Sequence, residues 1–136
     1  MQLGGAEITQ SVKAVSDQVA RKSYKDRFLV KIRDHIQSLK SEEATMFYAE
    51  GRTVYLVTED GRRYIIDYKL EALGELLQPD KFYRVNRTII VNIDAIKDVI
   101  VYSNSRLKVV LSTDFDKEII VSRDKVSAFK GWFEGK

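Results

Sequence analysis

The segment "FYRVNRTIIVN", residues 82–92, combines polar and strand-forming residues. Arg84, Asn86 and Arg87 precede an apolar run, 88–91, that is rich in β-branched residues. β-Branched and aromatic residues favour extended structure. The sequence therefore predicts a strand near 88–92 with two guanidinium groups and an amide at its entrance.

Further strand and turn signals lie on both sides of this stretch. Turn-forming dipeptides such as Asp60-Gly61 suit tight hairpins, because glycine adopts positive φ without strain. Before residues 82–92, we expect strands at 28–32, 35–39, 53–58 and 63–67, with corners at 33–34, 49–52 and 60–61. After them, we expect strands at 99–102, 106–111 and 117–121, with turns at 103–105 and 114–116.

Two short helices interrupt this β pattern. Leu70, Leu73, Leu76 and Leu77 fall on one helical face, with Asp67 as a candidate cap and Pro79 ending the helix. The second helix is predicted after Ser122, which we expect to cap it; its apolar side is formed by Val126, Phe129 and Phe133, with Trp132 beside them. The fold class is therefore mainly β, with short helices.

The first 22 residues differ in character from the rest. Ile8, Val12, Val15 and Val19 recur at steps of four, three and four, the spacing of a short coiled coil or amphipathic helix. Isolated helices of this length are marginal in water. We expect residues 1–22 to be an interdomain linker, either helical against a partner or a frayed connection, and residues 23–136 to be one domain.

Composition is that of a soluble globular protein. The 136 residues are 44% hydrophobic and 32% charged, with a formal charge of +3 that mildly favours anionic partners. Apolar runs fall far short of the roughly 20 residues that cross a bilayer. The sequence begins without a signal-peptide pattern and contains no Cys, so we expect a cytoplasmic protein without membrane contact.

The residue inventory argues against an enzyme. His35 is the single histidine, and no motif sets a nucleophile beside a base. Asp114, Asp116 and Glu118 alternate, but they lack the glycine and ligand spacing of a calcium loop. We therefore expect no catalytic residues, no metal and no cofactor.

Several motifs together resemble a known family. They are "RFLVKI", an aromatic strand leading into a polar corner, the leucine helix continuing into "LLQPDKFYRVNRTIIVNIDAIKDV", the strand "NSRLKVVL" and the closing "VSRDKVSAFKGWF". In this order, over residues 26–133, they are similar to the LytTR DNA-binding domain, usually the output half of bacterial response regulators.

The resemblance implies small stacked antiparallel sheets in which loops, rather than a recognition helix, enter the DNA grooves. Base-reading positions of the family fall on Arg87 and Arg123, and also on Thr53, although the corner at 51–53 departs from the family by lacking a histidine. The residues expected to bind DNA are Arg52, Thr53, Arg84, Asn86, Arg87, Thr88, Ser122 and Arg123.

The chemistry of these side chains is consistent with that expectation. A guanidinium matches the two major-groove acceptors of guanine or two phosphate oxygens, whereas hydroxyl and amide groups bond phosphates and fix register. Surface arginines are also often simply solvated or ion-paired. Arg84 in particular has the alternative of pairing with a buried acid and holding its loop. The aromatic residues Tyr48, Tyr55, Tyr64 and Phe82 are expected in the core rather than in a base-stacking platform.

The resemblance also implies partners. Two such domains would bind double-stranded DNA side by side at direct repeats, and a phosphorylated receiver domain in the full-length protein would promote this pairing. The seam at residues 8–19 would help two copies meet. The alternative is a β-rich protein-interaction or oligomerisation module that binds through a strand edge without DNA specificity.

Overall fold

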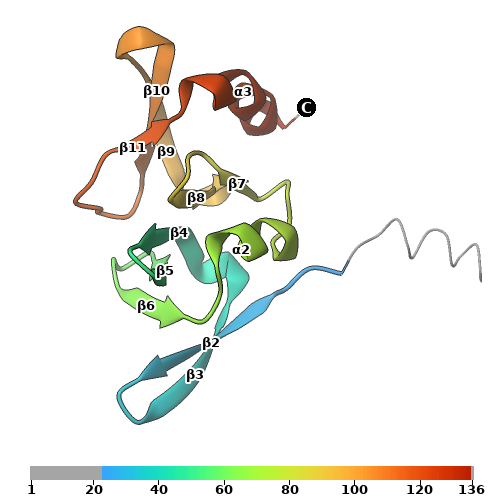
Figure 1. Ribbon diagram of the computed structural model, residues 1–136, viewed down its shortest axis with the longest axis vertical. Helices are drawn as coiled ribbons and strands as arrows, with labels where there is room; N and C mark the ends of the chain where they lie inside the picture. The colour runs from blue at the N-terminus through green and yellow to red at the C-terminus, as the bar shows by residue number, and fades with distance from the viewer. Residues whose placement is uncertain (1–22, 136) are drawn as a thin grey trace, which may run out of the picture.

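Three antiparallel sheets form the framework of residues 23–135, which are the residues that the computed structural model describes (Figure 1). The five-stranded sheet has the order β6 (Arg63–Ile66), β5 (Thr53–Thr58), β4 (Ala44–Glu50), β8 (Ile89–Asn92) and β7 (Phe82–Arg84). The three-stranded sheet has the order β11 (Ile119–Val121), β10 (Arg106–Leu111) and β9 (Ile96–Tyr102). A separate hairpin pairs β2 (Arg27–Ile32) with β3 (His35–Lys40).

Helical segments connect and cover these sheets. The α-helices are α2 (Leu70–Leu76) and α3 (Val126–Glu134), and the 3-10 turns are η1 (Ser41–Glu43), η2 (Ile93–Ala95), η3 (Ser103–Ser105) and η4 (Arg123–Lys125). Within residues 23–135, no helix has the length and apolar character needed to span a membrane.

The five-stranded sheet is the middle layer, and its central strands are buried on both faces. Along β4, Met46 and Tyr48 belong to one core while Phe47 belongs to the other. Along β8, Val91 belongs to the first of these cores and Ile90 to the second. Successive side chains of a strand point to opposite faces, which explains why the run at 89–91 is continuously apolar.

Each core is closed by different elements. The first core is completed by β10, β11 and Phe129 of α3, and the second by Phe28 and Val30 of β2 together with the leucines of α2. Figure 1 shows the consequence: β9–β11 and α3 lie at one end of the molecule and the β2–β3 hairpin at the other. Tyr48 and Phe82 are buried, and Tyr55 and Tyr64 pack against the cores, which confirms their expected packing role.

The expected hairpins and helices are present, with shifted ends. The turns at 33–34 and 60–61 are confirmed, and Gly61 has the positive φ of 85° that a tight turn favours. Strand β9 begins three residues earlier than expected and β11 two residues later. Strand β7 was not predicted, because three residues between a proline and a polar loop give no periodic signal.

Both predicted helix caps are wrong. Lys69, not Asp67, precedes α2, and no side chain caps it; Tyr68 stays outside the helix with its ring 5.4 Å from that of Phe28. Ser122 precedes the 3-10 turn η4 rather than α3, and its hydroxyl makes no cap bond. Its backbone N–H donates to the Val85 carbonyl at 3.2 Å.

Candidate nucleic-acid interface

Residues 85–88 join β7 to β8, and Arg87 lies at the tip of this β7–β8 loop. The Val85 N–H donates to the Ile89 carbonyl at 3.0 Å and closes the hairpin around residues 86–88. Arg87 and Thr88 are exposed, whereas Val85 and Ile89 at the base of the loop are buried. The buried base fixes the loop, and the short connection holds the Arg87 backbone beyond the sheet.

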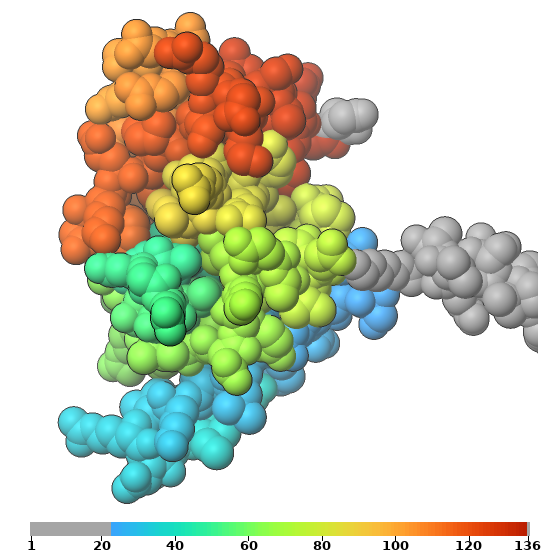
Figure 2. All heavy atoms as spheres, viewed as in Figure 1, coloured from blue at the N-terminus to red at the C-terminus, as the bar shows by residue number. Residues whose placement is uncertain are grey.

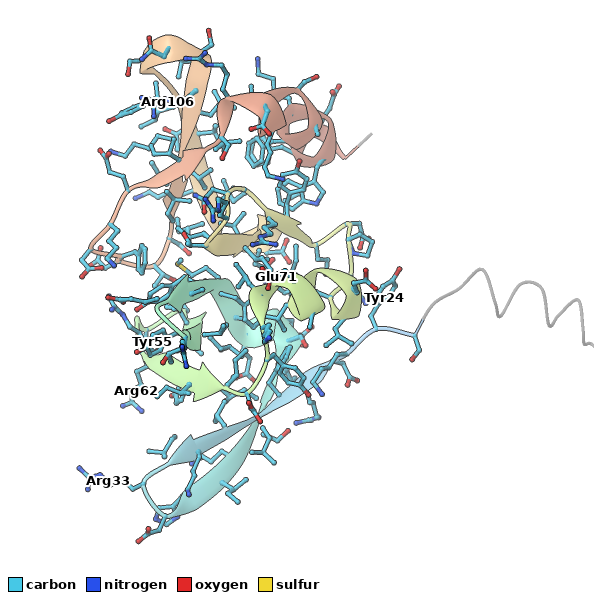
Figure 3. All side chains as sticks on the ribbon, viewed as in Figure 1. Tyr24, Arg33, Tyr55, Arg62, Glu71 and Arg106 are labelled. Atoms are coloured by element: carbon cyan, nitrogen blue, oxygen red, sulfur yellow. The ribbon has the colours of Figure 1, made fainter. Side chains whose placement is uncertain are left out.

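Arg84 holds this loop from inside. Its Nε donates to the Asn86 carbonyl at 3.2 Å and its Nη2 to the Arg87 carbonyl at 2.6 Å. The same Nη2 lies 3.7 Å from Glu71 of α2, a carboxylate whose side chain is 74% exposed (Figure 3). Arg84 therefore has the loop-holding role considered from the sequence, although its acidic partner is at the surface rather than buried.

Asn86 links the loop to the three-stranded sheet. Its Oδ1 accepts from the Thr88 N–H at 2.9 Å and from the Thr88 hydroxyl at 3.1 Å, a local side-chain turn typical of asparagine. Its Nδ2 donates to the Ile120 carbonyl of β11 at 2.8 Å. One side chain thus fixes both the loop conformation and its position against β11.

The β11–η4 junction lies against the same loop. The bond from the Ser122 N–H to the Val85 carbonyl runs beside the link from Asn86 to Ile120. Arg123 follows at the start of η4 and is exposed; its Nε donates to the Asn104 carbonyl of η3 at 3.3 Å. Arg123 therefore lies between the β7–β8 loop and the turn that joins β9 to β10.

The β4–β5 turn completes the arrangement. Glu50 pairs with Thr53, so Gly51, at φ 64°, and the exposed Arg52 form a two-residue turn. The Ala49 N–H near the end of β4 donates to the Thr88 carbonyl at 2.8 Å. The β4–β5 turn and the β7–β8 loop therefore lie at the same end of the five-stranded sheet.

Helix α3 supports the back of the β7–β8 hairpin. Tyr83 of β7 stacks on Trp132 with ring centroids 5.1 Å apart, and the Trp132 indole N–H donates to the Pro79 carbonyl at 2.8 Å. Burial raises the pKa of the Tyr83 hydroxyl, and the Asp124 carboxylate raises it further. Sequence analysis missed this support, because β7 itself was not predicted.

The family model for the LytTr DNA-binding domain matches residues 34–134. The chain belongs to this family. A curated relative, the sensory transduction protein LytT of Oceanobacillus iheyensis, is 28% identical over 122 residues, which are 90% of this chain and 48% of that protein. The chain thus spans about half the length of that relative.

A solved LytTr structure has the same fold. It is the LytTr DNA-binding domain of a Bacillus cereus protein described as a methyl-accepting/DNA response regulator. The TM-score is 0.70 at 23% identity, over 79% of this chain and 96% of the other. The expected mainly β architecture of small antiparallel sheets is therefore confirmed, and family membership places the chain among DNA-binding domains.

In this LytTr domain, the predicted site residues fall into three connected segments. Arg52 and Thr53 belong to the β4–β5 turn, Arg84 to Thr88 to the β7–β8 loop, and Ser122 and Arg123 to the β11–η4 junction. Within residues 23–135, the Arg87 guanidinium makes no hydrogen bond or ion pair, and Arg123 contacts one carbonyl and no carboxylate. In the same range, no group of three or more acidic or His side chains could hold a metal ion.

Proposed function

We propose that the chain binds double-stranded DNA in a sequence-dependent manner through the β4–β5 turn, the β7–β8 loop and the β11–η4 junction. The observation that carries this proposal is the set of hydrogen bonds that join the three segments. Thr88 bonds to Ala49, Asn86 to Ile120, and Ser122 to Val85. A contact surface built from segments that fix one another loses little conformational entropy on binding.

The side chains divide into three roles under this proposal. Arg87 and Arg123 read base edges, because their guanidinium groups are exposed and unpaired with carboxylates. Arg84 and Asn86 act on DNA indirectly by holding the loop. The remaining contacts, to phosphates or to bases in the neighbouring groove, come from Arg52, Thr53, Thr88 and Ser122. Several phosphate contacts would make the affinity fall steeply with salt.

The test begins with selection from random duplex DNA, followed by fluorescence anisotropy on the enriched sequence. We expect Arg87→Ala and Arg123→Ala each to cost about 1–3 kcal/mol on that sequence and to relax preference at one base position. Arg62→Ala is the matched control, because Arg62 is an exposed arginine of the β5–β6 turn, paired with Asp60 at 3.5 Å. It removes the same charge away from the loops and should change affinity by less than about twofold.

Two results would contradict the assignment. Uniform weakening of all sequences by both arginine variants would make these residues phosphate contacts rather than base readers. Failure to enrich any sequence at low salt would favour the alternative of a β-rich interaction module.

The proposal also covers how two copies of this domain pair on DNA within a longer protein. Two domains would occupy adjacent direct repeats, and a receiver domain in the full-length protein would promote their pairing. The support is that the matched LytT relative, a sensory transduction protein, is about twice as long as the matched region. Gel shifts on one and two copies of the selected site test the arrangement, because independent binding to two copies would exclude cooperative pairing. The expected pairing seam at residues 8–19 lies outside the described residues. Sedimentation of the chain with and without residues 1–22 tests whether this segment promotes the pairing of two copies.

A further inference from the structure

The β2–β3 hairpin has one face that is entirely exposed. The register pairs Arg27 with Lys40, Leu29 with Ser38 and Lys31 with Ile36. Because side chains alternate across a strand, these six share one face, here called the outer hairpin face, and all six are exposed. On the opposite face, Phe28 and Val30 are fully buried in the second core.

Two large apolar side chains lie on the outer hairpin face. Leu29 is 64% exposed and Ile36 is 66% exposed. They are diagonal neighbours across the two strands, a spacing within reach of a single covering side chain. Single exposed apolar residues are common, but an adjacent pair surrounded by cations is the pattern of a contact surface with a polar rim.

The hairpin is cationic. Residues 27–40 contain Arg27, Lys31, Arg33 and Lys40 against Asp34, a formal charge of +3 that equals the +3 of the whole chain. Arg27 donates to the Ser38 hydroxyl at 3.3 Å. Among the ion pairs of residues 23–135, none involves Arg27, Lys31 or Lys40. These cations therefore have no carboxylate partner within the described part of the chain.

The outer edge of β3 is also open. Within residues 23–135, β3 pairs only with β2, so its other edge has no strand partner. Figure 2 shows the hairpin standing out from the body of the molecule. The side chain of Arg33 points outward at its tip in Figure 3. An exposed edge of this kind can accept an added strand.

We propose that this hairpin binds an acidic, extended protein segment that adds to the edge of β3. Apolar side chains of the segment would cover Leu29 and Ile36, while its carboxylates would face Arg27, Lys31 and Lys40. A second copy of this chain fits poorly, because its own hairpin would bring like charges together. The binding does not rest on the proposed DNA function, since β3 leads into the start of β4 and the three DNA loops lie at its end.

DNA is the other polyanion that this cationic face could attract, and the observations favour protein. A phosphate backbone gains nothing from covering Leu29 and Ile36, whereas an acidic segment with alternating apolar residues contacts both kinds of side chain. The alternation of the outer face, in which cations and apolar residues lie side by side, matches the alternation of an added strand.

The experiment titrates the full chain, labelled with ¹⁵N, with a short peptide that alternates glutamate and valine. We expect amide shifts confined to residues 27–40 and largest along β3. Lys31→Glu combined with Lys40→Glu should lower the affinity for the peptide by about tenfold. Leu29→Ser should lower this affinity as well. Lys97→Glu, an exposed lysine of β9, is the matched control and should leave peptide binding unchanged. The Lys31 and Lys40 variant should keep its affinity for the selected DNA.

Four results would overturn the proposal. Equal binding of a lysine–valine peptide would show that charge is irrelevant, and equal binding of polyglutamate would show that the apolar pair is irrelevant. Hairpin shifts on adding duplex DNA, with loss of DNA affinity in the Lys31 and Lys40 variant, would assign the face to nucleic acid. Hairpin shifts that grow with protein concentration alone would assign it to a second copy.

Discussion

Asn86 offers the sharpest test of the linked loops, because one amide makes three hydrogen bonds. Asn86→Ala removes the bond from Nδ2 to the Ile120 carbonyl at 2.8 Å and the bonds to Oδ1 from the Thr88 N–H at 2.9 Å and the Thr88 hydroxyl at 3.1 Å. A typical hydrogen bond contributes about 0.5–1.5 kcal/mol net. The Thr88 groups are exposed and regain water, so we expect a total loss of about 2 kcal/mol.

The same substitution should weaken specific DNA binding, because the loop that carries Arg87 is no longer fixed to β11. Urea denaturation measures the stability loss, and anisotropy on the selected duplex measures affinity. Thr88→Val is the control for stability within the loop, since inside the domain it removes only the hydroxyl bond to Asn86 and should cost about 0.5 kcal/mol. Asn86→Asp keeps the acceptor for Thr88 and loses the donor to Ile120, so it isolates the link to β11.

Two observations would refute this reasoning. A stability loss for Asn86→Ala below about 0.5 kcal/mol would mean that the three bonds are replaced by water at no cost. Unchanged DNA affinity in a variant that is measurably destabilised would mean that the loop position does not matter for binding.

The remaining predictions concern α3 and its support of β7. Phe129→Ala should cost about 3–5 kcal/mol, because Phe129 is fully buried beside Tyr83 and Trp132, and an equal loss in the exposed variant Phe133→Ala would contradict this packing. The raised pKa of Tyr83 implies a stabilising contribution that is present below its ordinary pKa of 10.0 and is lost as the pH rises through the folded value. The urea midpoint of unfolding should therefore fall less between pH values below and above the Tyr83 pKa in Tyr83→Phe than in the parent protein. An equal fall in the two proteins would exclude the effect.

Local sequence signals predicted most strands, because hairpins are specified by neighbouring residues. The turn at Asp60-Gly61 and the β-branched run at 89–91 each combine turn chemistry with strand propensity, and both gave the correct element. The caps failed because both helices begin later than expected. Ser122 is a good cap residue by type, but it precedes the 3-10 turn η4, and α3 begins only at Val126. Lys69, rather than Asp67, precedes α2.

In the candidate site, too, local features could be predicted from the sequence and contacts between distant segments could not. The loop positions of Arg52 and Arg87 were predicted from the sequence. The bond from Asn86 to the Thr88 N–H was not predicted, although asparagine commonly accepts from the backbone two residues on. The bond from Asn86 to Ile120, and the approach of Arg123 to the Asn104 carbonyl, depend on how the two sheets lie together. Sequence therefore indicated which side chains stand at loops, and the structure shows which loops touch.

The middle sheet has a further consequence for how this domain can be altered. β4 and β8 contribute side chains to both cores. A fragment that ends between β8 and β9 would therefore expose Met46, Tyr48 and Val91 to solvent. Neither half is then a viable smaller unit, and thermal melting should show one transition rather than two. Insertions would be tolerated instead at the exposed hairpin tip around Arg33, which lies away from the shared layer.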